Sequence, residues 1–98
     1  MNMQAIMKQA QKMQNDIMKA KEEINKNIYE AKSSLVSVKM NGEKKLVEVK
    51  IGADQLDKDD IELLSDMIMV AVNEASNQVD KDTENKLGKY TQGMSGLF

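Results

Sequence analysis

The chain of 98 residues contains no cysteine, proline, histidine, tryptophan or arginine, and these absences exclude several classes of site. Without cysteine there are no disulfides and no thiolate-bound metals. Without histidine and cysteine the usual pairs of nucleophile and base cannot be assembled. The remaining acidic, basic and hydroxyl side chains form no recognisable catalytic constellation. We therefore predict a protein that is not an enzyme and has no metal, cofactor or small-molecule substrate.

Long hydrophobic runs are also missing. The longest run, 63–72, is interrupted by Ser65 and Asp66 and is too short to span a bilayer. The N-terminus lacks the basic segment, apolar core and cleavage site of an export signal. These features predict a cytoplasmic protein with no membrane partner. A chain of this length forms one domain, and small domains often gain stability by oligomerising.

Residues 3–24 carry apolar side chains at alternating intervals of three and four, which predicts an amphipathic helix with a heptad seam. The seam consists of Met3, Ile6, Ala10, Met13, Ile17, Ala20 and Ile24. Four lysines lie within about 40° of one another on a helical wheel, roughly opposite the seam. They are Lys8, Lys12, Lys19 and Lys26. The row of lysines fits either a solvated helix face or a surface that binds a polyanion, while the seam indicates a second copy as partner.

The net charge of −2 conceals a strong asymmetry. Residues 1–50 hold ten lysines and six acids, whereas residues 51–98 hold four lysines and ten acids. The two parts therefore carry charges of +4 and −6. Such a molecule can attract a polyanion with one part and repel it with the other, which would orient the complex.

Three strands are predicted over 28–34, 35–41 and 46–51, with a turn at 32–34 between the first two. The Asn41-Gly42 dipeptide indicates a hairpin between the second and third strands. A loop over 42–45 satisfies both faces of that hairpin. It pairs Met40 with Val47, Val38 with Val49, Val36 with Ile51 and Lys39 with Glu48.

A second helix is predicted to begin at Asp57, which caps it, and acids in its first turn face the positive end of the helix dipole. The acids over 54–62 lack EF-hand spacing, which favours this helix start over a calcium site. The apolar face is wide enough to be covered on two sides, by the sheet and by the first helix or a second subunit. We predict one domain over 1–87 and a flexible, glycine-containing tail over 88–98.

Four segments, taken in order, resemble the YbaB/EbfC family of nucleoid-associated DNA-binding proteins, and together they span essentially the whole chain. They are 7–14, 35–42, 66–75 and 93–98. The resemblance implies an α+β fold in the order α-β-β-β-α, with a three-stranded antiparallel sheet and two long helices. It also implies a bacterial homodimer that binds DNA through its paired helices and organises the nucleoid or regulates transcription.

The chain departs from the family pattern in two respects. Its turn between the first and second strands is shorter than the family's glycine-rich turn, and the arginines common in the family are absent. Arginine reads guanine edges with a planar fork, whereas lysine is a point charge suited to phosphate. We therefore expect phosphate contacts with duplex DNA in the nucleoid and little sequence specificity.

The resemblance, the heptad seam and the row of lysines together define the expected sites. The expected DNA-binding residues are Lys8, Lys12, Lys19, Lys26, Lys86 and Lys89. The expected dimer interface contains Met3, Ile6, Ala10, Met13, Ile17, Ile68 and Val72. Two alternatives remain open: a scaffold protein whose seam pairs with another protein's helix without direct DNA binding, and membrane-surface binding by the first helix. The absence of Trp and Phe from that helix counts against the membrane alternative.

Overall fold

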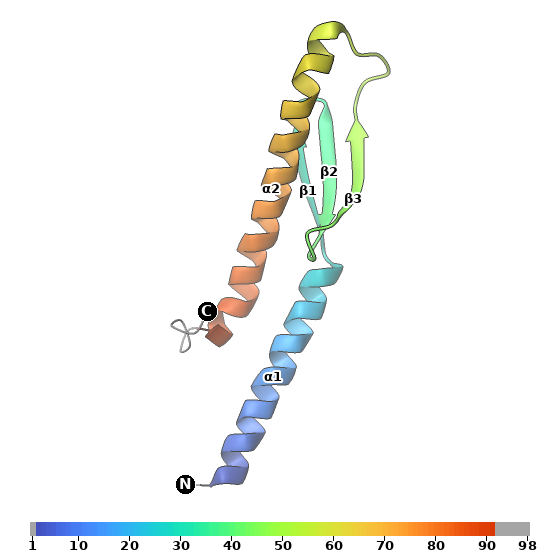
Figure 1. The fold of residues 1–98 in the computed structure, drawn as a ribbon. Coiled ribbons are helices and arrows are strands. Elements are labelled where there is room, and N and C mark those ends of the chain that lie inside the picture. Colours follow the sequence, from blue (N-terminus) through green and yellow to red (C-terminus); the bar gives the residue numbers. More distant parts are fainter. Residues whose placement is uncertain (1, 92–98) are drawn as a thin grey trace.

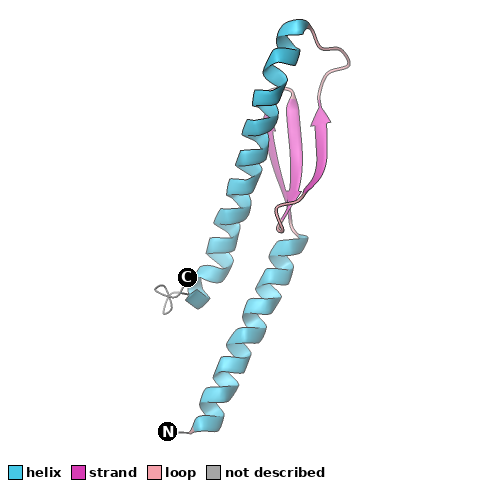
Figure 2. Cartoon of the chain, viewed as in Figure 1, coloured by secondary structure: helices cyan, strands magenta, loops and turns pink. Residues whose placement is uncertain are grey.

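The computed structural model describes residues 2–91, which form two helices and one sheet (Figure 1). The elements, in chain order, are α1 (Met3–Lys26), β1 (Ile28–Ser33), β2 (Val36–Asn41), β3 (Leu46–Ile51) and α2 (Lys58–Thr91). The strands form one antiparallel sheet in the order β1-β2-β3. Figure 2 shows α2 running alongside the strands, while α1 extends away from the end of the sheet. The predicted α+β fold in the order α-β-β-β-α is confirmed.

Both helices begin at side chains that satisfy free backbone N–H groups. The Asn2 side chain accepts hydrogen bonds from the backbone N–H groups of Gln4 (3.0 Å) and Ala5 (3.4 Å). At α2, the backbone N–H of Asp60 donates to the Asp57 carboxylate at 2.8 Å, and the backbone N–H of Asp57 donates back to the Asp60 carboxylate at 3.4 Å. The predicted caps at Asn2 and Asp57 are therefore confirmed.

The core lies between α2 and one face of β1 and β2. Val36 and Val38 are fully buried there, and they face Ala71 and Ala75, which are also fully buried. Alanine at these two positions lets the helix approach the sheet closely. Within the described chain α2 packs on β1 and β2 and makes no comparable contact with β3. The apolar side chains of β3 are consequently exposed; they are Leu46, Val47, Val49 and Ile51.

The register of the β2–β3 hairpin agrees with the prediction except at its loop end. Val36 pairs with Ile51, Val38 with Val49 and Lys39 with Glu48, but Met40 pairs with Leu46 where Val47 was predicted. The Asn41 side chain accepts from the backbone N–H groups of Glu43 and Lys45, at 2.9 and 3.1 Å. These bonds hold Lys45 opposite Asn41, so Leu46 comes opposite Met40. Val47 is then the extra residue of a β-bulge.

One predicted turn was wrong, and the second helix extends further than expected. The turn between β1 and β2 lies at Ser34 and Leu35 rather than at 32–34, and Ser34 adopts a positive φ of 52°. Residues 88–91, which were predicted as part of the tail, are helical, because α2 continues through Gly88 to Thr91. Glycine weakens a helix interior but does not end it. The remainder of that predicted tail, 92–98, lies outside the described residues.

The sheet end of α1 rests on the β2–β3 loop. A Cβ added to Gly42 would lie 1.9 Å from the Ile24 carbonyl oxygen, so only glycine allows this approach. Ile24 is also the one residue of α1 that is buried. The molecule measures 71 × 24 × 14 Å and has a radius of gyration of 19.5 Å. A compact chain of this length would have a radius near about 13 Å, so the single chain is markedly elongated.

Candidate nucleic-acid interface

The lysines of α1 are exposed and make no ion pair within residues 2–91. Lys8, Lys12, Lys19 and Lys26 all belong to this set. Lys39 of β2 and Lys50 of β3 differ, because their ammonium groups have carboxylate neighbours. Lys39 lies 3.5 Å from Glu30 and 3.6 Å from Glu48, and Lys50 lies 3.7 Å from Glu48. The lysines of α1 are therefore available to an external anion, as a row on one helix.

The two expected lysines of α2 have different surroundings. The Lys86 ammonium lies 3.1 Å from the Asp82 carboxylate, one helical turn away. The Lys89 ammonium lies 5.0 Å from the centroid of the Tyr90 ring, which is a cation–π distance. The positive charge of Lys86 is thus offset by a neighbouring carboxylate, whereas Lys89 has no carboxylate partner within residues 2–91.

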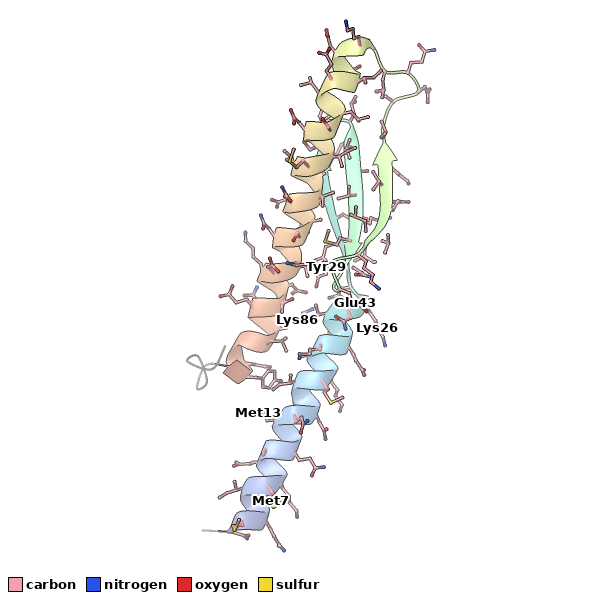
Figure 3. The ribbon with its side chains drawn as sticks, in the orientation of Figure 1. Met7, Met13, Lys26, Tyr29, Glu43 and Lys86 are labelled. Atoms are coloured by element: carbon pink, nitrogen blue, oxygen red, sulfur yellow. The ribbon has the colours of Figure 1, made fainter. Side chains whose placement is uncertain are left out.

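A hydrogen-bonded cluster joins α2 to the start of β1, just beyond the end of α1. The Tyr29 hydroxyl donates to the Asp82 carboxylate, which also pairs with Lys86 (Figure 3). The Tyr29 hydrogen bond, reinforced by Lys86, holds the pKa of the Asp82 carboxyl below its ordinary value. Burial and the bond to Asp82 raise the pKa of the Tyr29 hydroxyl. This cluster fixes where α2 passes the junction between α1 and β1.

An open groove of about 410 Å³ lies beyond this cluster, between α1 and the last turns of α2. Asp16, Lys19 and Glu23 line it from α1. Lys86, Lys89 and Tyr90 line it from α2. The fold thus brings together three of the six expected DNA-binding lysines, from positions about 70 residues apart.

The other three expected lysines stand apart from the groove. Met7 and Met13, between which Lys8 and Lys12 lie in the sequence, are on the part of α1 that extends past the end of α2, and Lys26 lies at the sheet end of the helix (Figure 3). Sequence reasoning missed Tyr90 and the acids of the groove. The adjacency of Tyr90 to Lys89 was the one local signal for the tyrosine, and only the packing of the helices shows that both face α1.

The apolar seam of α1 is divided into a covered half and an uncovered half. Ile24 is buried, and Ile17 is half-buried. Toward the N-terminus the seam is open, with Met3 at 74% and Ile6 at 47% exposed. The expected interface residues of α2 are half-buried, because they pack against the edge of the core; they are Ile68 and Val72.

Neither helix within 2–91 is long and apolar enough to cross a membrane. No group of three or more acidic side chains in that range is arranged to hold a metal ion.

The fold and the distribution of charge define a small α+β protein in which a lysine-bearing helix projects from a sheet covered by a longer helix. The YbaB/EbfC DNA-binding family model matches residues 1–94. The chain therefore belongs to the YbaB/EbfC family, as its sequence motifs predicted. This family is defined by DNA binding and is not a known enzyme family.

Curated relatives and a solved structure agree with this assignment. A nucleoid-associated protein of Enterococcus faecalis is 42% identical, over 98% of this chain and 94% of the relative. A nucleoid-associated protein of Lactococcus lactis is 45% identical, over 96% of this chain and 97% of the relative. The crystal structure of an uncharacterized protein from Helicobacter pylori has a TM-score of 0.71 and 25% identity, covering 87% of this chain and 91% of that one.

Proposed function

We propose that this protein binds duplex DNA as a homodimer, mainly through contacts between lysines and phosphates, and thereby organises the nucleoid or modulates transcription. The observation that carries the proposal is the row of exposed lysines on α1, none of which has an ion-pair partner within residues 2–91. Membership of a DNA-binding family and relatives named nucleoid-associated support the same conclusion.

The chemistry of the row favours backbone contacts over base reading. Lysine presents a compact charge that suits phosphate, and the chain has no arginine to read guanine edges. The acids at the start of α2 lie at the opposite end of the molecule from the N-terminus of α1 (Figure 1). Their repulsion would keep that end away from DNA and direct the α1 end toward it.

The homodimer is supported by apolar surface that a single chain leaves uncovered. The open half of the α1 seam is one such surface, and we propose Met3, Ile6, Ala10, Met13 and Ile17 as its contact residues. The exposed apolar side chains of β3 are another. Ile68 and Val72 lie at the edge of the core and would join an interface formed there. An elongated monomer with this much exposed apolar surface gains free energy by pairing.

The DNA-binding proposal is tested by reversing the charge of Lys8, Lys12 and Lys19 to Glu in one variant. Binding to an unrelated duplex at low salt should weaken roughly 100-fold, since each lysine that contacts a phosphate contributes a salt slope of about −0.9 on a log–log plot. Affinity is measured by fluorescence anisotropy at several salt concentrations. Unchanged affinity and slope would refute the proposed contacts.

The matched control reverses Lys32, Lys50 and Lys58, which lie near the ends of β1 and β3 and at the start of α2. It changes the net charge by the same amount but should leave the salt slope within about 0.5 of the original value. Equal losses in both variants would indicate a response to net charge alone. If the unmodified protein fails to bind duplex DNA at low salt, the scaffold alternative replaces this proposal.

Dimerisation is tested separately by light scattering at micromolar concentration. The expected mass is twice the chain mass of 11.0 kDa. The triple variant at Lys8, Lys12 and Lys19 should keep this mass, because these lysines lie away from the seam. A monomeric mass for the unmodified protein would contradict the proposed interface.

A further inference from the structure

The groove between α1 and the end of α2 has a composition that phosphate binding alone does not explain. Two of its cations, Lys19 and Lys89, make no ion pair within the described residues. Asp16 and Glu23 line the same groove, and their carboxylates would repel a phosphate placed beside them. A ligand that suits the whole groove must therefore carry a negative group and also donate hydrogen bonds.

An aromatic ring supplies the third feature of the groove. Tyr90 lies in its wall and is partly exposed, whereas Tyr29, the other aromatic residue within 2–91, is buried in the core. The Lys89 ammonium lies over one face of the Tyr90 ring, so a base stacked on this ring would take the opposite face, with the cation close by. Stacking of bases on aromatic rings beside a basic groove is the usual way in which proteins hold unpaired nucleotides.

The chemistry of a nucleotide matches these three features. Its phosphate suits Lys19 and Lys89, and its base offers a flat face to Tyr90. The amino and imino groups on base edges donate to carboxylates such as those of Asp16 and Glu23. The volume of about 410 Å³ falls within the range of small-ligand sites, which begins near about 300 Å³.

We propose that this groove binds an unpaired nucleotide of a nucleic-acid strand, with its base stacked on Tyr90 and its phosphate held by Lys19 and Lys89. This inference rests on the proposed DNA binding and adds a second mode to it. The lysines of the projecting part of α1 contact duplex phosphates, and the groove accepts a base that has left the duplex or belongs to a single strand. In a duplex the stacked bases are unavailable to Tyr90, so the ring contributes only to the second mode.

The test compares Tyr90→Leu with Tyr90→Phe, which keeps the ring. Anisotropy is measured with a labelled single-stranded oligonucleotide of mixed sequence and with the duplex of the same sequence. Tyr90→Leu should weaken single-strand binding by about 5- to 100-fold, the usual effect of losing one stacked base. Tyr90→Phe should stay within about threefold of the unmodified protein, and all three proteins should bind the duplex equally. Equal single-strand affinity of the Leu and Phe variants would overturn the inference.

A second variant tests the groove from its opposite wall. Ala20 lines the groove from α1, and Ala20→Leu would fill part of it. Single-strand binding should fall while duplex binding is retained, and the circular dichroism of the variant checks that it remains helical. Unchanged single-strand binding in Ala20→Leu would count against the groove even if Tyr90 mattered.

Two further comparisons complete the test. One distinguishes failure of this inference from failure of the proposed function, and the other distinguishes a nucleic-acid strand from a free nucleotide as the ligand. Duplex binding that persists while Tyr90→Leu has no effect on single strands would refute the groove alone, whereas absence of all nucleic-acid binding would refute both proposals. A nucleoside monophosphate should compete only weakly with the oligonucleotide. A monophosphate that binds as tightly as the oligonucleotide would overturn the assignment of a strand as the ligand.

Discussion

The two helices of this protein are both amphipathic, but they use their apolar faces differently. The middle of α2 lies on the sheet, where Ala71 and Ala75 are fully buried. In contrast, α1 has one buried residue, Ile24, and most of its apolar seam is open. The comparison shows that α2 stabilises the fold of one chain, whereas α1 offers its side chains to other molecules.

The difference follows from how each helix is attached. Small side chains along α2 allow continuous contact with β1 and β2. Within the described residues, α1 is held only toward its sheet end, by the close approach of Ile24 to Gly42 and by its contacts with α2. Substitutions in the sheet and the middle of α2 should therefore change stability, whereas those in the projecting part of α1 should change binding.

The largest effect is expected when a charge enters the α2–sheet contact. Ala75→Asp would bury a carboxylate with no partner, and the free energy of unfolding should fall by about 4 kcal/mol or more. Chemical denaturation followed by circular dichroism measures this change. The same substitution at Ala5 adds an exposed carboxylate near the start of α1, where the helix dipole favours it, and should change stability by less than about 0.5 kcal/mol. Similar losses of stability in both variants would contradict the conclusion that α2, and not the projecting part of α1, stabilises the fold.

Replacing glycine by alanine is expected to lower the stability at one position and to raise it at another. Gly42→Ala brings a Cβ against the Ile24 carbonyl and should cost about 1–3 kcal/mol. Gly88→Ala adds a Cβ that, among residues 2–91, meets no atom within 4 Å apart from its own helix turn, and it removes a glycine from the helix, so it should gain about 0.5–1 kcal/mol. Thermal unfolding of the two variants compares them directly. A stabilised Gly42→Ala protein would show that α1 does not rest on this loop.

A smaller, pH-dependent effect is expected at the cluster that joins the two regions. Asp82→Asn weakens the hydrogen bond from Tyr29 and the ion pair with Lys86, and should cost about 1 kcal/mol near neutral pH. The pKa of Asp82 is lower in the folded protein than its ordinary value of 3.8, so its contribution to stability is present above that pH. The contribution is lost as the pH falls below 3.8 through the folded pKa, because the unfolded chain takes up the proton first. The difference in stability between the two proteins should therefore shrink as urea denaturation is repeated at decreasing pH.

The control for this effect is Asp80→Asn on the same helix. Asp80 pairs with Lys44 at 2.7 Å, but its side chain is 60% exposed. Exposed pairs contribute little, so its loss should change stability by less than about 0.5 kcal/mol at neutral pH. A larger loss of stability in Asp80→Asn than in Asp82→Asn would contradict this prediction. It would show that α2 is held mainly by the pair with Lys44 of the β2–β3 loop.

The sequence predicted most of the local structure because short-range physics decides it. Asn2 and Asp57 cap helices through their own neighbouring N–H groups, and the pairing of Val38 with Val49 follows from alternation along each strand. The bulge at Val47 escaped prediction because it depends on how the Asn41 side chain folds the loop. The extension of α2 past Gly88 escaped because a glycine weakens a helix without fixing where it ends.

The sequence by itself determined the order of elements, the family and the row of lysines on α1, since periodicity and motif order are properties of the chain. Only the tertiary structure decided which half of the seam is covered and that Lys19 shares a groove with Lys89 and Tyr90. The physical reason is that side chains about 70 residues apart meet only when the sheet fixes the angle between α1 and α2. That angle depends on the approach of Ile24 to Gly42 and on the bond from Tyr29 to Asp82, neither of which has a local signature.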